Sequence, residues 1–174
     1  AFNLPLLFFA IGIIFGLGSG VTAVIAQYIG MKNKRNADNA AEHSILMGII
    51  LSGIFTLIGW LYGKDLLLLL GTPKNILIDA YSYFIILVSG IIFMVLGVFF
   101  RSILSGEGDN KFPMYVLGGG TILNIILDPI LIFWLNMGVK GAAAATIISQ
   151  ALVCVVFLYA FLVKKHPYIT FSPR

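Results

Sequence analysis

Long apolar runs alternate with short polar segments along the whole chain. A membrane-spanning helix takes about 20 mostly apolar residues at a rise of about 1.5 Å each. Five runs meet this length, at residues 4–29, 43–62, 79–100, 113–135 and 141–163. The segment "DLLLLLGTPKN" (65–75) is too short to span, and it predicts a turn of interfacial helix that Gly71 and Pro73 end. The pattern therefore predicts an all-α membrane protein, a polytopic bundle of five transmembrane helices.

The composition agrees with lipid as the main solvent. Of the 174 residues, 60% are hydrophobic and only 10% are charged, and the mean hydropathy is +1.03. A soluble domain has roughly a quarter of its residues charged, so the bilayer is the expected environment. The formal net charge of +4 does not predict nucleic-acid binding, because the basic residues are distributed as in a membrane protein.

These basic residues fall mainly on one side of the predicted membrane. Five spans place successive loops on alternating sides, and eight of the eleven lysines and arginines then share a side. The positive-inside rule makes that side cytoplasmic. We therefore expect the 30–43 loop, the 101–111 loop and the C-terminus in the cytoplasm, in a multi-pass protein of the plasma or inner membrane. The eight residues are Lys32, Lys34, Arg35, Arg101, Lys111, Lys164, Lys165 and Arg174.

The first residues, "AFNLPLL", have no methionine and no basic segment, so they do not resemble a signal peptide. The sequence begins inside an apolar run, and we expect a piece of a longer protein. Cys154 is the sole cysteine. It excludes an intrachain disulfide and is expected to be a small core-facing thiol.

One acidic residue lies at bilayer depth. Asp128 stands within "TILNIILDPILIF" (121–133), whereas the other six acids fall in loops or at helix ends. A carboxylate at mid-membrane costs about 2.5–3.5 kcal/mol on insertion scales. It is either a structural acid, protonated or hydrogen-bonded to a neighbouring helix, or a proton or cation site. We favour the site, because a membrane interior strongly disfavours charge without a purpose.

The neighbours of Asp128 support a cation or proton site. Asn124 comes four residues earlier and shares its helix face. Pro129 has no N–H, so it frees the carbonyl of Ile125 and predicts a helix kink. A carboxylate, an amide oxygen and a free carbonyl suit a hard cation. Asp128 and Asn124 would therefore be the metal ligands if the cation is Na⁺.

Other spans offer further polar groups. Thr146 and Gln150 are four residues apart and face one way, although the hydroxyl of Thr146 could instead bond to a carbonyl of its own helix. Gln27 is a further amide that could face a cavity. Tyr81 and Tyr83 lie near one end of the third span, where interfacial anchoring is the usual role of tyrosine. The pattern alone does not choose between these two.

The remaining patterns are less specific. The triple glycine at 118–120 either bends its helix or packs closely, and the residues leave both open. "GLGSG" (16–20) imitates a phosphate loop, but no strand precedes it, and we interpret it as helix packing. His43 and His166 are too far apart in sequence to predict a metal pair. With no HExxH, GxSxG or cysteine pair, we expect neither an enzyme nor a cofactor beyond the coupling ion.

Four stretches together resemble the multidrug and toxic compound extrusion (MATE) transporters. They are "GVTAVIAQYIGMKN" (20–33), "RSILSGEGDNKFPM" (101–114), "NIILDPILI" (124–132) and "GVKGAAAATIISQ" (138–150). The resemblance covers nearly the whole chain. It implies a twelve-helix transporter with two six-helix lobes, in which these five spans are helices two to six of the N-terminal lobe. The first helix and the C-terminal lobe would then be partners within the same transporter.

The resemblance also implies an activity and a site. It implies a secondary active antiporter that exports small organic, often cationic, compounds in exchange for H⁺ or Na⁺. It places cation or proton coupling at Asp128, Asn124, Tyr83 and Thr146, and only the resemblance prefers Tyr83 to Tyr81. The family also uses an acid of the first helix, which this chain lacks. The alternatives are a lipid-linked oligosaccharide flippase of the same superfamily and a non-transporting membrane scaffold subunit.

Overall fold

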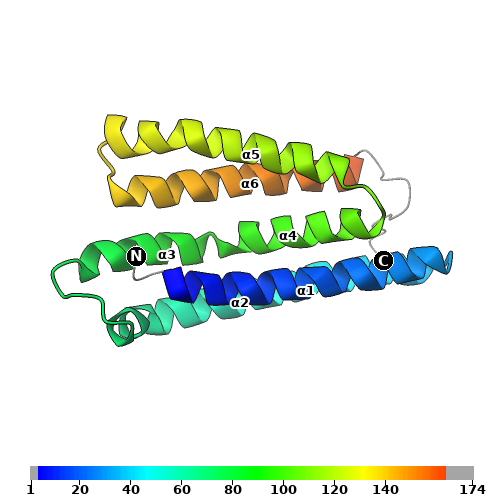
Figure 1. Ribbon diagram of the computed structural model, residues 1–174, viewed down its shortest axis with the longest axis horizontal. Helices are drawn as coiled ribbons and strands as arrows, with labels where there is room; N and C mark the ends of the chain where they lie inside the picture. Colours follow the sequence, from blue (N-terminus) through cyan, green and yellow to red (C-terminus); the bar gives the residue numbers. More distant parts are fainter. Residues whose placement is uncertain (1–3, 164–174) are drawn as a thin grey trace.

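The computed structural model describes residues 4–163, which are helical apart from short turns (Figure 1). The elements are α1 (Leu4–Gly30), α2 (Lys34–Leu69), α3 (Leu77–Ser89), α4 (Ile91–Gly106), α5 (Lys111–Pro129), the π-helix η1 (Ile130–Trp134) and α6 (Val139–Val163). The predicted all-α bundle is confirmed. The C-terminal residues that we expect in the cytoplasm, Lys164, Lys165 and Arg174, lie outside the described residues, as does His166.

Five apolar crossings can be traced through the bundle. α1, α2, α5 with η1, and α6 are each long and apolar enough to span a membrane. α3 and α4 reach that length only together, and a bend of 44° separates them at Gly90. Figure 1 shows the two helices end to end along the bundle, as one broken span. The predicted span 79–100 is therefore wrong as a single helix, and its two halves extend from Leu77 to Gly106.

Contacts from α2 hold this break. The Thr56 hydroxyl donates to the carbonyl of Val88 at 3.1 Å, and Trp60 Nε1 donates to the Ser89 hydroxyl at 3.1 Å. Both acceptors lie in the last turn of α3, immediately before Gly90. A carbonyl freed at a helix break needs another donor in a membrane, and Thr56 supplies one. The break thus depends on residues distant in the sequence.

α2 is longer at both ends than predicted. It begins at Lys34, so the predicted 30–43 loop shortens to 31–33, and the Asn33 side chain accepts the N–H of Asn36 at 3.2 Å as its cap. Residues 65–69, where the sequence predicts an interfacial turn of helix, are helical and continue α2 without a break. The charged residues at 64 and 65 do not interrupt the helix.

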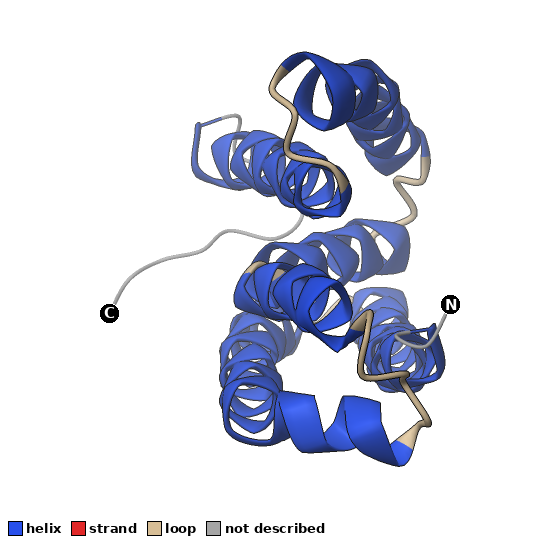
Figure 2. Ribbon diagram, turned by 90° about the vertical axis from the view of Figure 1, so that its left-hand side faces the viewer, coloured by secondary structure: helices blue, strands red, loops and turns tan. Residues whose placement is uncertain are grey.

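The last turns of α2 nevertheless run across the end of the bundle (Figures 1 and 2). They end at Gly71, which has a φ of +79°. The N–H of Thr72 bonds the carbonyl of Leu67 at 3.1 Å, as in a Schellman cap. Glycine adopts this left-handed conformation without the penalty of a Cβ, so the predicted stop at Gly71 is confirmed. At the other predicted cytoplasmic loop, α4 continues to Gly106, and only residues 107–110 connect it to α5.

Two groups of helices pack together. α1, α2 and α4 share a core with one face of α6, and α5 lies beside α6 as an antiparallel partner (Figures 1 and 2). Phe100 of α4 contacts Phe157 and Phe161 of α6, with ring centroids 6.1 and 5.3 Å apart. Many large apolar side chains on the outer faces are exposed, including Phe9, Trp60 and Ile122. Exposed apolar faces on long helices are what a surrounding bilayer requires, and the chain is a multi-pass membrane protein.

Candidate functional site

Four of the predicted site residues line two cavities beside α6, and they are Tyr83, Asn124, Thr146 and Gln150, whereas Asp128 lines neither cavity. The central cavity has a volume of about 210 Å³ and lies between α1, α3, α4 and α6. The α5–α6 cavity has a volume of about 150 Å³ and lies between the two helices of its name. Thr146 and Gln150 line both cavities, because their spacing of four residues puts them on one face of α6. This face forms the wall between the two spaces.

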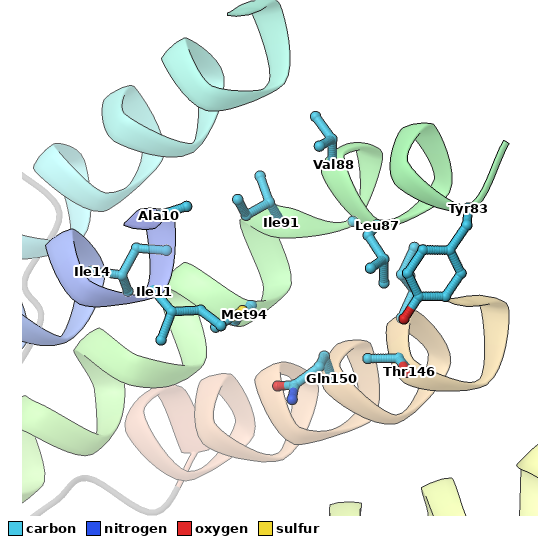
Figure 3. A pocket seen from close by; sticks show the side chains of 12 residues that line it. Ala10, Ile11, Ile14, Tyr83, Leu87, Val88, Ile91, Met94, Thr146 and Gln150 are labelled. Atoms are coloured by element: carbon cyan, nitrogen blue, oxygen red, sulfur yellow. The ribbon is translucent and has the colours of Figure 1, made fainter. Parts of the chain in front are cut away.

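Tyr83 reaches the central cavity from α3. Figure 3 shows its ring lying against α6, with the hydroxyl directed toward Thr146. Apolar side chains of α1 and α4, including Ile11 and Met94, form the opposite wall. Tyr81 instead packs beside Leu67 in a small apolar cluster at the end of α2. Of the two tyrosines, only Tyr83 lines a cavity with another predicted site residue.

Asn124 reaches the second cavity from α5. Five polar residues line this space, together with the apolar Leu117 and Val153 and with Gly120, and the five are Thr121, Asn124, Thr146, Ser149 and Gln150. Asn124 is half-buried, and its Nδ2 is buried with no hydrogen-bond partner in the described part of the chain. An amide donor left unpaired at this depth is costly. A ligand or water that pairs with Asn124 would remove this cost.

Asp128 continues the same face of α5, one turn beyond Asn124. Its side chain is half-buried, and within residues 4–163 its buried Oδ1 also lacks a hydrogen-bond partner. The structural alternative for this acid is a protonated side chain or a hydrogen bond to a neighbouring helix, and residues 4–163 provide no such bond to Oδ1.

Thr146 combines the two roles that its sequence position leaves open. Its hydroxyl donates to the Ala142 carbonyl of its own helix at 3.0 Å, which is the structural alternative. The same oxygen keeps its lone pairs as acceptors, and the residue lines both cavities. Thr146 therefore still offers a hard oxygen ligand.

The backbone changes its helical register directly after Asp128. α5 ends at Pro129, and residues 130–134 form a π-helix in which the N–H of Leu135 bonds the carbonyl of Ile130 at 3.0 Å. Pro129 cannot donate to Ile125, so the α-helical hydrogen bonding fails at this point. π-helical turns are frequent at functional sites. The irregularity predicted at Pro129 thus takes the form of a widened helix.

Close contacts at both ends join α5 and η1 to α6. A Cβ at Gly141 would lie 2.7 Å from the backbone carbonyl oxygen of Leu131, and a Cβ at Gly120 would collide with Val153. No heavy atom lies within 4 Å of the corresponding positions at Gly118 and Gly119. The triple glycine therefore serves close packing at its last member, while its first two members leave the helix surface open.

The oxygen donors around α6 suit a small hard cation. Asp128 brings a carboxylate, Asn124 an amide oxygen, and Thr146 and Tyr83 bring hydroxyls. In residues 4–163, no group of three or more His, Cys, Asp or Glu side chains gathers as a metal site would require. One carboxylate with neutral oxygens fits Na⁺ or a proton better than a transition metal.

Comparison with known proteins assigns the fold to a family. The MatE family model matches residues 1–130. The chain belongs to the MatE family. The probable multidrug resistance protein YoeA of Bacillus subtilis (strain 168) is 33% identical over 167 residues, which are 94% of this chain and 36% of that protein.

Solved structures from the family match the whole described bundle. One is the inward-facing conformation of a multidrug resistance MATE family transporter of the MOP superfamily, with a TM-score of 0.93, 33% identity, and coverage of 99% of this chain and 40% of that one. The outward-facing conformation gives a TM-score of 0.95 at 33% identity, with coverage of 99% and 38%. The chain thus spans two fifths or less of the length of these MatE relatives.

For two further residues, Gln27 and Ser149, the structure differs from what the sequence predicts. Gln27 is exposed on α1 and is not among the residues that line either cavity, so the structure does not bring it to the site. Ser149 lines the α5–α6 cavity but was not singled out by the sequence analysis. Its place three residues after Thr146 was the available indication, because residues at this spacing share a helix face.

Proposed function

We propose that this chain forms helices two to six in the N-terminal lobe of a twelve-helix, two-lobe antiporter. The antiporter exports small organic, often cationic, compounds across the plasma or inner membrane in exchange for H⁺ or Na⁺. Membership of the MatE family supports transport, and several relatives are named as multidrug resistance or multidrug export proteins. The observation that supports ion coupling is the buried Oδ1 of Asp128, which has no hydrogen-bond partner within residues 4–163 and lies in a helix apolar enough to span a membrane.

The mechanism we propose is neutralisation of Asp128. When ionised, a carboxylate inside the membrane is tolerated only while water reaches it. Binding of H⁺ or Na⁺ removes the net charge, so the site can close around Asp128, Asn124 and Thr146. A ligand shifts a conformational equilibrium only through its different affinities for the two states. The cost of burying an ionised carboxylate supplies this difference.

The segment after Asp128 is the element that responds in this proposal. The helix changes from α to π directly after Pro129. The hydrogen bonds of residues 130–134 can therefore rearrange without breaking a regular α-helix. Thr146 and Gln150 form the wall between the site and the central cavity. A shift at Asp128 would therefore reshape the cavity in which an exported compound binds. The residues that line that cavity are mostly apolar and include no lysine or arginine, which favours an organic cation over an anionic substrate.

The positive-inside rule gives the orientation of this unit. It places residues 31–33, residues 107–110 and the C-terminus on the cytoplasmic side. The coupling ion then enters from the opposite side and leaves into the cytoplasm, while the exported compound moves outward. The first helix and the C-terminal lobe are the partners that complete the transport pathway.

The test uses the complete transporter that carries this sequence, in proteoliposomes with an imposed proton or sodium gradient. Asp128→Asn keeps the shape of the side chain but removes the charge that binds the cation. We expect gradient-driven efflux of an organic cation such as ethidium to fall by at least about tenfold, equivalent to about 1.4 kcal/mol. Asp79→Asn, at an exposed acid in the first turn of α3, is the matched control and should behave as wild type.

Wild-type efflux by Asp128→Asn, with unchanged dependence on the gradient, would reject the proposal. The same experiment separates the alternatives. A scaffold subunit would show no gradient-dependent efflux in any variant. A flippase would transport an oligosaccharide-linked lipid, which the same vesicles can be made to contain.

A further inference from the structure

The α5–α6 cavity is lined by Ser149, a buried polar residue that has no role in the coupling site proposed above. Ser149 is 4% exposed, and its Oγ has no hydrogen-bond partner among the described residues. Asn124 Nδ2 is a second buried atom without a partner on the same cavity. Buried polar groups are normally paired with protein, ordered water or a ligand. Two orphan groups facing one space indicate that the space is occupied in the working protein.

The contacts at Gly120 and Gly141 fix where this occupant sits. They hold the antiparallel helices together at Gly120, which lines the cavity, and at Gly141, which lies outside it. Counting along the helices from these two contacts places Ser149 level with Asn124. It places Asp128 one turn nearer to Gly141, on the same face of α5 as Asn124. The orphan pair therefore lies beside the proposed coupling carboxylate, between it and the Gly120 end of the cavity.

Water fits this space better than an apolar ligand. A volume of about 150 Å³ admits several water molecules, each of which takes up about 30 Å³ in the liquid. A buried water usually makes about three hydrogen bonds, and five of the residues that line the cavity are polar. The hydroxyls of Thr121 and Thr146 donate to carbonyls of their own helices, so both oxygens remain free to accept from water. Asn124 Nδ2 donates, and Ser149 does either.

We propose that Ser149 and Asn124 hold ordered water in the α5–α6 cavity, and that this water carries the coupling cation between the central cavity and Asp128. The inference rests on the coupling role proposed above for Asp128. The wall of Thr146 and Gln150, shared by both cavities, is the place where the cation crosses. Ser149 acts as a positioning residue, because it orients the water that solvates Asp128 between ion-binding events.

Thiol labelling tests whether the cavity is wet. In a version of the complete transporter without other cysteines, Ser149→Cys is exposed to a small cationic methanethiosulfonate in proteoliposomes. A version that keeps only the native Cys154 is the matched control, because Cys154 lies on α6, is similarly buried at 3% exposure, and does not line the cavity. We expect Ser149→Cys to react at least about tenfold faster, because thiol reactivity follows access. Equal slow rates at the two positions would overturn the proposal.

The cation dependence of efflux tests the role of the water. Ser149→Ala removes the hydroxyl, whereas Ser149→Thr keeps it. We expect Ser149→Ala to raise the cation concentration for half-maximal efflux roughly three- to tenfold, the effect of one net hydrogen bond, with little change in the maximal rate. Ser149→Thr should restore most of the wild-type value. An unchanged value for Ser149→Ala, or equal losses in both variants, would count against the proposal.

The two proposals fail in different ways. If Asp128→Asn retains gradient-driven efflux, the coupling role of Asp128 is wrong whatever the labelling shows. If Asp128→Asn abolishes efflux while Ser149→Cys stays as unreactive as Cys154, only the water-filled cavity is wrong.

Discussion

The α1–α4 interface and the α5–α6 interface use the same small-residue packing but treat their polar groups differently. In the first, the hydroxyl of Thr22 donates across the interface to the carbonyl of Ser102 at 3.0 Å, and it shares this bond with the Gly18 carbonyl of its own helix at 3.2 Å. In the second, Asn124, Asp128 and Ser149 each leave a buried atom without a partner in the described residues. Both interfaces contain glycines whose missing side chains permit close approach.

This difference separates packing from function. A polar group that bonds across a helix interface stabilises the bundle, and nothing further is needed to account for it. An unpaired polar group in a low-dielectric interior has a cost, which a packing interface has no reason to keep. The α1–α4 contact is therefore structural, whereas the α5–α6 contact combines close packing at Gly120 and Gly141 with buried polar groups that the described residues leave unpaired.

The largest effect is expected at the Gly141 end of the α5–α6 contact. Gly141→Ala would place a Cβ 2.7 Å from the carbonyl oxygen of Leu131, and backbone atoms cannot move aside as a side chain can. We expect a loss of about 3 kcal/mol in the free energy of unfolding, at the upper end of overpacking effects. Unfolding by SDS in mixed micelles measures it. Gly53→Ala has no atom within 4 Å of the new Cβ and is the control.

The Gly120 end should give the next largest effect. Gly120→Ala would collide with Val153, whereas Gly119→Ala has open space around it. We expect the first to destabilise by about 1–3 kcal/mol, and the second to stabilise by about 0.5–1 kcal/mol, because alanine restricts the unfolded chain. The same unfolding measurement applies. If the two neighbouring variants were equivalent, α5 would not contact α6 as described.

The double variant Gly120→Ala with Val153→Ala provides an internal check. Removing the two methyl groups of Val153 gives the new Cβ room, so the two changes should be strongly non-additive. Additive losses would instead place the effect of Gly120→Ala in the helix itself.

The sequence predicts features that are set within one helix, and it does not predict those set by contacts between distant residues. Hydropathy predicts the five crossings, and a spacing of four residues puts Asn124 and Asp128 on one face, because both properties follow from the helix alone. The break at Gly90 could not be predicted, since residues 79–100 are almost uniformly apolar. It is held by Thr56, which lies 32 positions from its acceptor Val88.

Ser149 shows the same limit within the site. A serine in a membrane helix usually bonds a carbonyl of its own helix, as Ser44 does with Ala40 at 2.6 Å. The sequence gives no indication that Ser149 departs from this habit. Only the packing of α5 on α6 shows that the Ser149 hydroxyl is buried and has no hydrogen-bond partner in the part of the chain that the structure describes. In the same way, the choice between Tyr83 and Tyr81 needed the position of α3 relative to α6.

A smaller effect is expected from the bonded hydroxyl of the α1–α4 contact. Thr22→Val keeps the shape of the side chain but removes the hydrogen bond to Ser102. Interhelical hydrogen bonds in a membrane protein contribute about 0.6 kcal/mol on average and at most about 1.7, so we expect a loss in this range. Ser44→Ala is the control, because the Ser44 hydroxyl bonds the carbonyl of Ala40 in its own helix and lies away from both cavities. Equal losses at both positions would remove the contrast between the interfaces.

The smallest expected change in stability distinguishes a wet site from a dry defect. If Ser149 Oγ is truly unpaired, Ser149→Ala would remove a cost of about 1–3 kcal/mol and stabilise the protein by that amount. If ordered water pairs with the Ser149 hydroxyl, its removal relieves no cost of an unpaired group, and the free energy of unfolding should change by less than about 0.5 kcal/mol. SDS unfolding of Ser149→Ala beside Ser52→Ala, whose hydroxyl bonds the carbonyl of Ile49 at 2.8 Å, separates the two cases. A clear stabilisation by Ser149→Ala would mean that the α5–α6 cavity is dry and that its unpaired polar groups lower the stability of the fold.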